Sequence, residues 1–196
     1  TITLVSGTYT LTLTGINEES AATGDLDIRN NGTLLITGAG KGVTIIDAAQ
    51  LDRVFDIFDG ATVEFRNLTI TGGLLDYSHG AGFYARFGST VTLTNVAIDN
   101  NVVQSTGTGD RHGGGIWANQ ATITGSDVDI TNNRAERNAG TNNNVGGGAW
   151  LSGDSTVTLT NVTITGNTAR DGGGFYMSAG NFGGSSVTLT NAAINN

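Results

Sequence analysis

A pattern of short strands returns along this chain at a nearly fixed interval, and this repeat constrains the fold more than any other feature of the sequence. Each copy holds a Thr/Ser-Val/Ile-Thr-Leu-like strand, a second apolar strand, and a glycine cluster followed by a hydrophobic pair. Aligned on Val63, Val91, Ile123, Val157 and Val187, the copies are 28, 32, 34 and 30 residues apart. A period near 30 made of strands and turns is typical of a stacked solenoid. The copies span Ala61–Gly88, Ser89–Gln120, Ala121–Asp154 and Ser155–Gly184, and a fifth begins at Ser185.

The copy Ser155–Gly184 shows how one coil is built. Side chains alternate faces along a strand, so Val157 and Leu159 are expected to point inward and the threonines between them outward. Asn161 marks a bend before the second strand, which ends at a Gly-Asn turn. Three strands and three corners make one coil, and looser copies upstream bring the total to about six. The sequence therefore predicts an all-β, single-stranded parallel β-helix, with residues 1–196 as one domain.

Composition excludes several kinds of partner and site. Nine basic residues against seventeen acidic ones give a net charge of -8, which argues against binding to nucleic acid or to an anionic membrane surface. The chain has no cysteine, so disulfides, thiolate metal sites and cysteine nucleophiles are excluded. No apolar run approaches the ~20 residues of a membrane-spanning helix, and we expect no membrane insertion.

The two ends lead to further expectations. The amino terminus has no charged-then-apolar leader, so we expect any export signal to lie outside these residues. The chain stops within a coil at Asn196, which would leave strand edges unpaired. We therefore expect a fragment of a longer β-helix, or a last coil that is covered by a partner. End-to-end self-association of such rods is one form that this contact could take.

Several segments resemble a large bacterial family of secreted right-handed parallel β-helix repeat proteins, often named for a Cys-Ser-Leu-Arg-Glu-Ala signature. The resemblance covers essentially the whole chain, although the signature itself is absent. The glycine clusters also look like the repeats of polymorphic outer-membrane autotransporters, as in Gly113–Ile116. Both resemblances imply a right-handed helix and a rod that is extracellular or at the bacterial cell surface, and neither implies a catalytic residue set. The segments that carry the first resemblance are Ile2–Leu11, Thr23–Ile28, Ile36–Gly40, Leu51–Phe55 and the recurring Gly-Gly-Gly-aromatic blocks.

An aromatic column is the strongest candidate for a ligand site. After each glycine cluster comes a three-residue strand whose middle residue should face outward, and these residues are Tyr84, Trp117, Trp150 and Tyr176. With Arg86 and Asn119 beside it, such a stripe would suit a polysaccharide or surface glycan. The alternative is that the preceding loops fold over the column and bury it as a small core.

Two weaker patterns suggest metal binding. His79 and His112 precede equivalent glycine clusters, so adjacent coils would bring the imidazoles within about 5 Å, with Asp110 nearby. Asp129 and Asp99 lie one coil apart and are the closest approach to a calcium cluster. In both cases the alternative is a set of solvated polar side chains, and we expect no cofactor unless Ca²⁺ binds there.

We therefore expect a non-enzymatic extracellular rod with a structural or adhesive role, which contacts a glycan through its long-loop face. The alternative is a polysaccharide lyase or hydrolase, or a carbohydrate-binding module, using the same face; the convergent ionisable groups of an enzyme are not evident in the sequence. A third hypothesis is ice binding, because outward threonines form regular columns, although Glu64 and Arg66 interrupt the array in the preceding coil. These columns are Thr90/Thr122/Thr156 and Thr92/Thr124/Thr158/Thr188.

Overall fold

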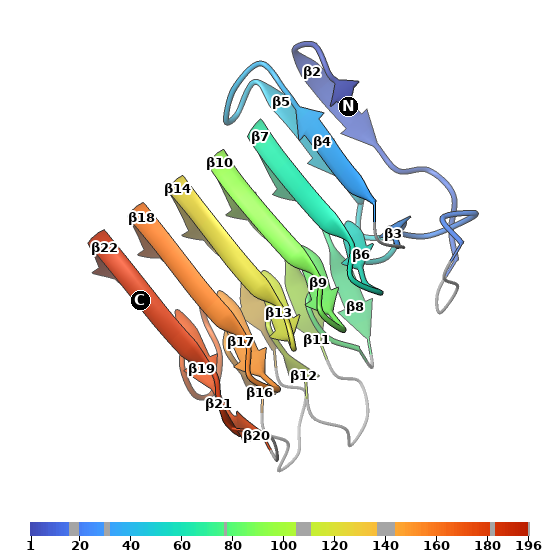
Figure 1. Ribbon diagram of the computed structural model, residues 1–196. Helices are drawn as coiled ribbons and strands as arrows, with labels where there is room; N and C mark the ends of the chain where they lie inside the picture. Colours follow the sequence, from blue (N-terminus) through green and yellow to red (C-terminus); the bar gives the residue numbers. More distant parts are fainter. Residues whose placement is uncertain are drawn as a thin grey trace.

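The chain winds into a solenoid of stacked coils, with its two termini at opposite ends (Figure 1). The computed structural model describes residues 1–15, 20–29, 32–76, 78–104, 111–136, 144–180 and 183–195. These residues contain strands and turns and no helix, and thus no helix that could cross a membrane. Strands pair in parallel throughout, apart from one small antiparallel pair. The predicted all-β parallel solenoid of about six coils is confirmed.

The largest sheet, the long-strand sheet, has nine strands and contributes one or two of them from every coil. Its main path runs through β1 (Ile2–Thr3), β4 (Thr33–Thr37), β7 (Thr62–Thr71), β10 (Thr90–Asp99), β14 (Thr122–Thr131), β18 (Thr156–Thr165) and β22 (Ser186–Asn195). In the first two coils, β2 (Gly7–Thr10) and β5 (Thr44–Asp47) extend the sheet beside the second half of β7.

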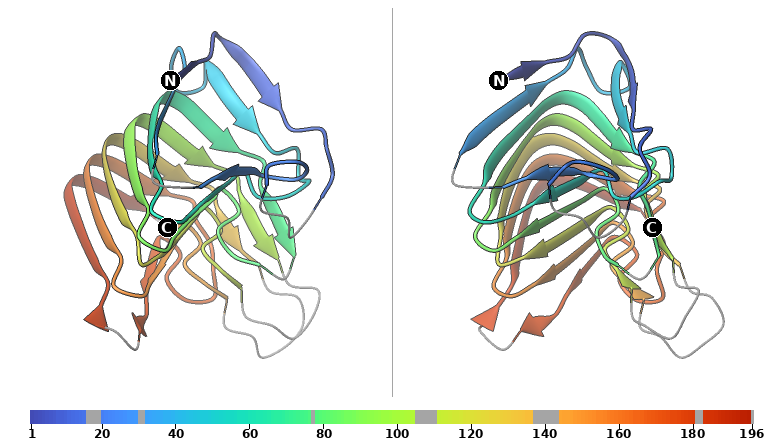
Figure 2. Two further views of the ribbon diagram at one scale, coloured as in Figure 1. Left: turned by 45° about the vertical axis from the view of Figure 1, so that its right-hand side comes forward. Right: turned by 90° about the vertical axis from the view of Figure 1, so that its right-hand side faces the viewer.

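The second sheet has six short strands and forms another wall of the solenoid. Its strands are β3 (Leu26–Ile28), β6 (Phe55–Ile57), β9 (Phe83–Arg86), β13 (Ile116–Asn119), β17 (Ala149–Ser152) and β19 (Phe175–Met177). Figure 2 shows the two sheets facing each other across the interior. The remaining strands are β8 (Leu74–Asp76), β11 (Val102–Gln104), β15 (Arg134–Ala135), β12 (Arg111–His112), β16 (Asn144–Val145), β20 (Ala179–Gly180) and β21 (Gly183–Gly184).

The register between coils matches the sequence alignment. Val63, Val91, Ile123, Val157 and Val187 lie opposite one another on successive strands, as predicted. The first four are buried, and Val187 packs against the core from the last coil. The main apolar core therefore runs along the solenoid, formed by like side chains stacked at roughly 4.8 Å per coil, and a small second cluster holds Leu75, Ala81 and Val103.

The two short strands predicted in each coil are in fact one bent strand of ten residues from β7 onward. The bend falls at one residue per coil in the left-handed region, with φ between 51° and 58°, and these residues are Asn67, Asn95, Asp127, Asn161 and Asn191. Asparagine and aspartate tolerate this conformation better than other non-glycine residues. The backbone thus turns a corner without leaving the sheet, which merges the two strands.

The segments before the glycine clusters also contain more structure than expected. We predicted loops there, but β8, β11 and β15 pair in parallel across three coils. Within the clusters, a Cβ on Gly114 would lie 2.5 Å from the carbonyl oxygens of Arg134 and Gly147. The absence of a side chain at this position therefore lets neighbouring coils approach closely.

A column of buried asparagines closes the corner that follows β10, β14 and β18. Asn101, Asn133 and Asn167 are buried, and each amide links its own coil to its neighbours. The side-chain oxygen of Asn133 accepts from the backbone N–H and the amide of Asn101, both at 3.0 Å. Its amide donates to the Ile98 carbonyl at 2.8 Å and to the oxygen of Asn167 at 3.0 Å. Polar backbone groups at a dry corner are satisfied in this way.

Replacing Asn133 with alanine should lower the free energy of unfolding by about 2–4 kcal/mol. The change leaves the N–H of Asn101 and the carbonyl of Ile98 buried without these partners, and each such group costs about 1–3 kcal/mol. Urea unfolding followed by circular dichroism measures the difference. The exposed Thr158→Ala variant is the control, with an expected loss of about 0.5 kcal/mol or less. Equal losses in the two variants would contradict this role for the column.

Candidate functional site

The aromatic residues predicted to share one face do lie in a column on the second sheet. Trp117 is in register with Tyr84 on one side and with Trp150 on the other, and Trp150 is in register with Tyr176. The same column continues toward the amino terminus through Asp56 and Asp27, which the sequence analysis did not include. We call these six outward positions the ladder. Its two positions nearest the amino terminus are aspartates, and the other four are aromatic residues.

The aromatic rings of the ladder stack on one another. Tyr84 and Trp117 have ring centroids 3.7 Å apart at an angle of 9°, and Trp117 and Trp150 follow at 5.0 Å and 12°. Tyr84 is buried, both indoles are half-buried, and Tyr176 is 36% exposed. The flat faces of Tyr84 and Trp117 are therefore turned toward other rings. A sugar ring needs an exposed aromatic face for stacking, so the inner part of the ladder is better suited to stiffening the wall.

The two histidines lie against the ladder. Their rings stack with centroids 5.0 Å apart at 6°, which is the separation expected from the sequence. His79 makes an edge contact with Trp117 at 4.6 Å, and His112 lies 4.1 Å from Trp150. The backbone N–H of His112 donates to Nδ1 of His79 at 3.0 Å, so this nitrogen serves as an acceptor. Metal binding by the pair stays a prediction, and Asp110 lies outside the described residues.

The other two glycan candidates are engaged within the wall. The Arg86 guanidinium donates to both oxygens of Asp56, at 3.1 and 3.0 Å, and lies 5.2 Å from the centre of the Tyr84 ring. The Asn119 amide approaches the Tyr84 hydroxyl at 3.5 Å. Direct contact of Arg86 with a glycan would thus compete with an ion pair whose side chains are 14% and 7% exposed.

A buried charge cluster lies at the acidic end of the ladder. The guanidinium of Arg53 donates to Asp25 at 3.1 Å and to Asp56 at 2.9 Å, and it also contacts the Gly80 carbonyl and the Ser78 hydroxyl. All three ion-paired side chains are less than one-tenth exposed. In the sequence, Asp25 and Arg53 stand out only as parts of segments that resemble a known family. Their charged residues, spaced about one coil apart, were the signal that could have identified the cluster.

Three acids of this cluster come close enough to be considered as metal ligands. Oxygens of Asp25, Asp27 and Asp56 lie within 4.8 Å of one another, and no other such group of three occurs among the residues the structure describes. Arg53 already binds two of these carboxylates. Since a guanidinium takes the place that a cation would need, the arrangement is that of an internal ion-pair network.

Burial perturbs the protonation of one member of the network. Desolvation raises the pKa of Asp25 from its ordinary 3.8 to about 7, although the charge of Arg53 acts in the opposite direction. Asp52, Asp27 and Asp56 add to the rise by repulsion. Near neutral pH, the buried cluster therefore keeps a proton on Asp25 for part of the time.

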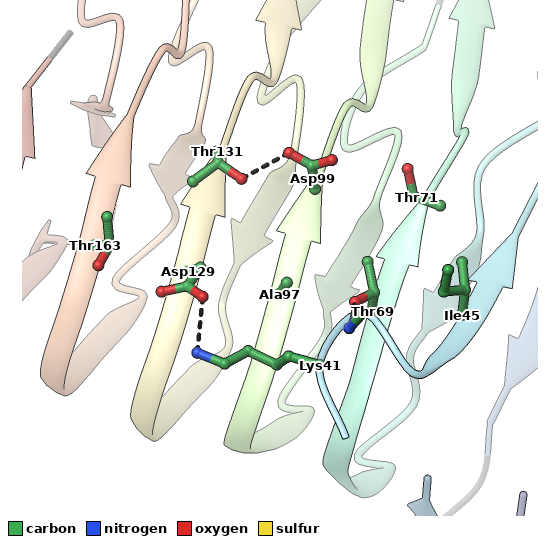
Figure 3. A pocket seen from close by; sticks show the side chains of 10 residues that line it. Lys41, Ile45, Thr69, Thr71, Ala97, Asp99, Asp129, Thr131 and Thr163 are labelled. Atoms are coloured by element: carbon green, nitrogen blue, oxygen red, sulfur yellow. Dashed lines mark hydrogen bonds and ion pairs between the residues drawn. The ribbon is translucent and has the colours of Figure 1, made fainter. Parts of the chain in front are cut away.

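The acids that were considered for calcium lie on a different face, the outer side of the long-strand sheet. Asp129 pairs with Lys41 at 2.7 Å, and Asp99 accepts hydrogen bonds from Thr131 at 2.6 Å and from Asn132 at 2.8 Å. Figure 3 shows Lys41 crossing the strand of Ala97 to reach Asp129. These groups line a groove of about 740 Å³. An ammonium group therefore occupies the position beside Asp129 that a calcium ion would need.

The threonine columns behind the ice-binding hypothesis are in register. Thr90, Thr122 and Thr156 lie opposite one another, and so do Thr92, Thr124, Thr158 and Thr188. The hydroxyls of Thr92 and Thr124 lie 3.4 Å apart. In the preceding coil, Glu64 and Arg66 form an ion pair and interrupt the array. Ice binding itself stays a prediction.

Parallel in-register coils, one continuous core and corners closed by asparagine define a β-helix solenoid. The family model for the right-handed beta helix region matches residues 4–196, so the chain belongs to this family and the helix is right-handed. No curated protein and no solved structure matches the chain. The predicted β-helix is thus confirmed, while a secreted bacterial origin stays a prediction.

The raised pKa of Asp25 predicts a loss of stability as pH rises. Its folded pKa of about 7 exceeds the unfolded value of 3.8, so the folded state binds the proton more tightly and is favoured below about pH 4. This advantage disappears between about pH 4 and 7. Relative to Asp25→Asn, which titrates no proton there, the wild type should lose roughly 2–4 kcal/mol over this range. Urea unfolding at several pH values tests this, and a difference independent of pH would contradict it.

Proposed function

We propose that this protein is a non-enzymatic β-helix rod with a structural or adhesive role, that it is exported to the outside of the cell, and that it contacts a glycan. One observation carries the proposal. Four largely buried charged side chains at the acidic end of the ladder pair with one another: Arg53 and Arg86 neutralise Asp56, and Arg53 also binds Asp25. A catalytic site needs a base or acid that faces its substrate. A structural scaffold needs only that its buried charged side chains have ion-pair or hydrogen-bond partners.

The regular stacking supports a mechanical role. From β7 to β22, five long strands pair at nine positions each, with no change of register. Successive coils contact each other through backbone hydrogen bonds and core columns, and three of them also through the asparagine column. A solenoid of this kind resists bending because successive coils are hydrogen-bonded to each other in its two largest sheets.

A polysaccharide-active enzyme is the second candidate, and one observation favours it. Asp25 has a carboxyl whose pKa is raised to about 7, and such a group can serve as a general acid near neutral pH. Its neighbours Asp27 and Asp56 supply further carboxylates within 4.8 Å. Against this, Asp25 is only 6% exposed and Asp56 only 5%.

Incubation with a panel of neutral and acidic polysaccharides separates the two candidates. The rod should be retained on at least one insoluble polysaccharide while no new reducing ends or unsaturated products form. Product formation by the wild type that disappears in Asp25→Asn would establish the enzyme instead. Product formation that persists in Asp25→Asn would also contradict the proposal, and would place the chemistry elsewhere in the chain.

A further inference from the structure

We propose that the groove on the outer face of the long-strand sheet, beneath Lys41, binds a neutral oligosaccharide. This inference deepens the proposed adhesive function, since it gives the place and the class of the glycan. It also moves the binding site away from the ladder, where the rings cover one another's faces. The groove is lined by Lys41, Gly42, Ile45, Thr69, Thr71, Ala97, Asp99, Asp129, Thr131 and Thr163.

The groove exists because the second coil differs from those that follow. Later coils turn the corner of the long strand with a single left-handed residue, whereas the second coil uses the loop between β4 and β5. This loop is tied down by a hydrogen bond from the Gly42 N–H to the Thr69 hydroxyl at 2.9 Å. From it, Lys41 reaches across the sheet to Asp129 and to the carbonyl of Asp127 at 3.0 Å. This loop and the Lys41 side chain form one side of the groove.

The floor of the groove is open at one position. Ala97 lies in register between Thr69 and Asp129, and its methyl group is the smallest side chain among the groove-lining residues of that row. The parallel row carries Thr71, Asp99 and Thr131. Oxygen-bearing side chains therefore recur along the solenoid axis at roughly the 4.8 Å spacing of the strands. A chain of hydroxylated rings lying along this axis would meet a polar group at almost every coil.

The groove offers hydrogen-bond acceptors that the protein does not use. One oxygen of Asp99 is held by Thr131 and Asn132, and one oxygen of Asp129 is held by Lys41. Within the part of the chain that the structure describes, the other oxygen of each carboxylate accepts no hydrogen bond. Carboxylates accept and do not donate, so the ligand must bring donors such as sugar hydroxyls. Thr71 and Thr163 add hydroxyls that can either donate or accept a hydrogen bond.

Charge selects among the possible glycans. Two carboxylates and one ammonium leave the groove with one net negative charge, in a chain of net charge -8. A polyuronate would be repelled by both. A cationic ligand would be repelled by the ammonium of Lys41, which already pairs with Asp129, and would find only Asp99 in the groove without a cationic partner among the described residues. A neutral sugar meets neither obstacle, and without an aromatic platform in the groove its binding should be weak.

Binding is tested by saturation-transfer NMR with cellohexaose, xylohexaose, mannohexaose and a hexamer of galacturonate. The wild type should bind at least one of the neutral hexasaccharides and not the galacturonate. Ala97→Leu fills the floor of the groove and should weaken that binding at least tenfold. Thr94→Leu is the matched control, because it adds a leucine to the outer face of the same strand outside the groove. It should bind like the wild type.

Each other outcome overturns the inference in a distinguishable way. Failure of all three neutral sugars to bind, or equal binding by Ala97→Leu, excludes the groove as their site. Binding that is lost in Trp117→Ala but kept in Ala97→Leu would place the glycan at the ladder and leave the adhesive function standing. Binding of the galacturonate alone would refute the charge argument. Circular dichroism of every variant excludes loss of fold as the cause.

Discussion

The structure depends on the in-register stacking of each coil on the one before it. Backbone hydrogen bonds join equivalent residues of successive strands, and the side-chain alternation then places like residues on like positions. A slip of one residue would turn Val91 or Ile123 out of the core and bring a threonine in. The apolar columns, the buried asparagines and the ladder all follow from this one constraint. None of them would survive as a column in an antiparallel sheet.

The sequence predicts what depends on local alternation and on the repeat. The aligned valines, the outward threonines and the column from Tyr84 to Tyr176 could all be placed because a strand fixes which way each side chain points. The bend at Asn161 was evident, but the alternation could not show that the strand continues through it. The left-handed conformation keeps both halves in one sheet.

Features that depend on side-chain rotation or on irregular coils could not be predicted. Alternation places Trp117 on the outer face but does not say that its ring stacks on Tyr84. The charge cluster lies in the first coils, where the repeat is too loose to align Asp27 with Asp56 or to bring Asp25 beside Arg53. The groove depends on a lysine that reaches an aspartate 88 residues away in the sequence. Each of these features depends on side-chain conformations or long-range contacts that are set only in the folded structure.

The same solenoid therefore presents two different polar surfaces. Along the ladder, charges are neutralised internally and aromatic rings cover one another, which stiffens the wall. Across the long-strand sheet, the second coil adds a loop over an otherwise regular surface and leaves carboxylate oxygens facing a groove. Regular coils supply the rigid support, and the irregular coil supplies the candidate site. This division is common in repeat proteins, whose insertions carry their binding functions.

Distances between spin labels along one column test the stacking most directly. The chain has no cysteine, so labels attach only at introduced positions. Leu35, Glu64, Thr92 and Thr188 belong to one column, in which Thr188 lies three, four and five coils from Thr92, Glu64 and Leu35. Pulsed electron paramagnetic resonance should give distances near 14, 19 and 24 Å for these pairs, increasing by roughly 4.8 Å per coil. Distances that do not increase by a constant step would contradict the parallel stacking.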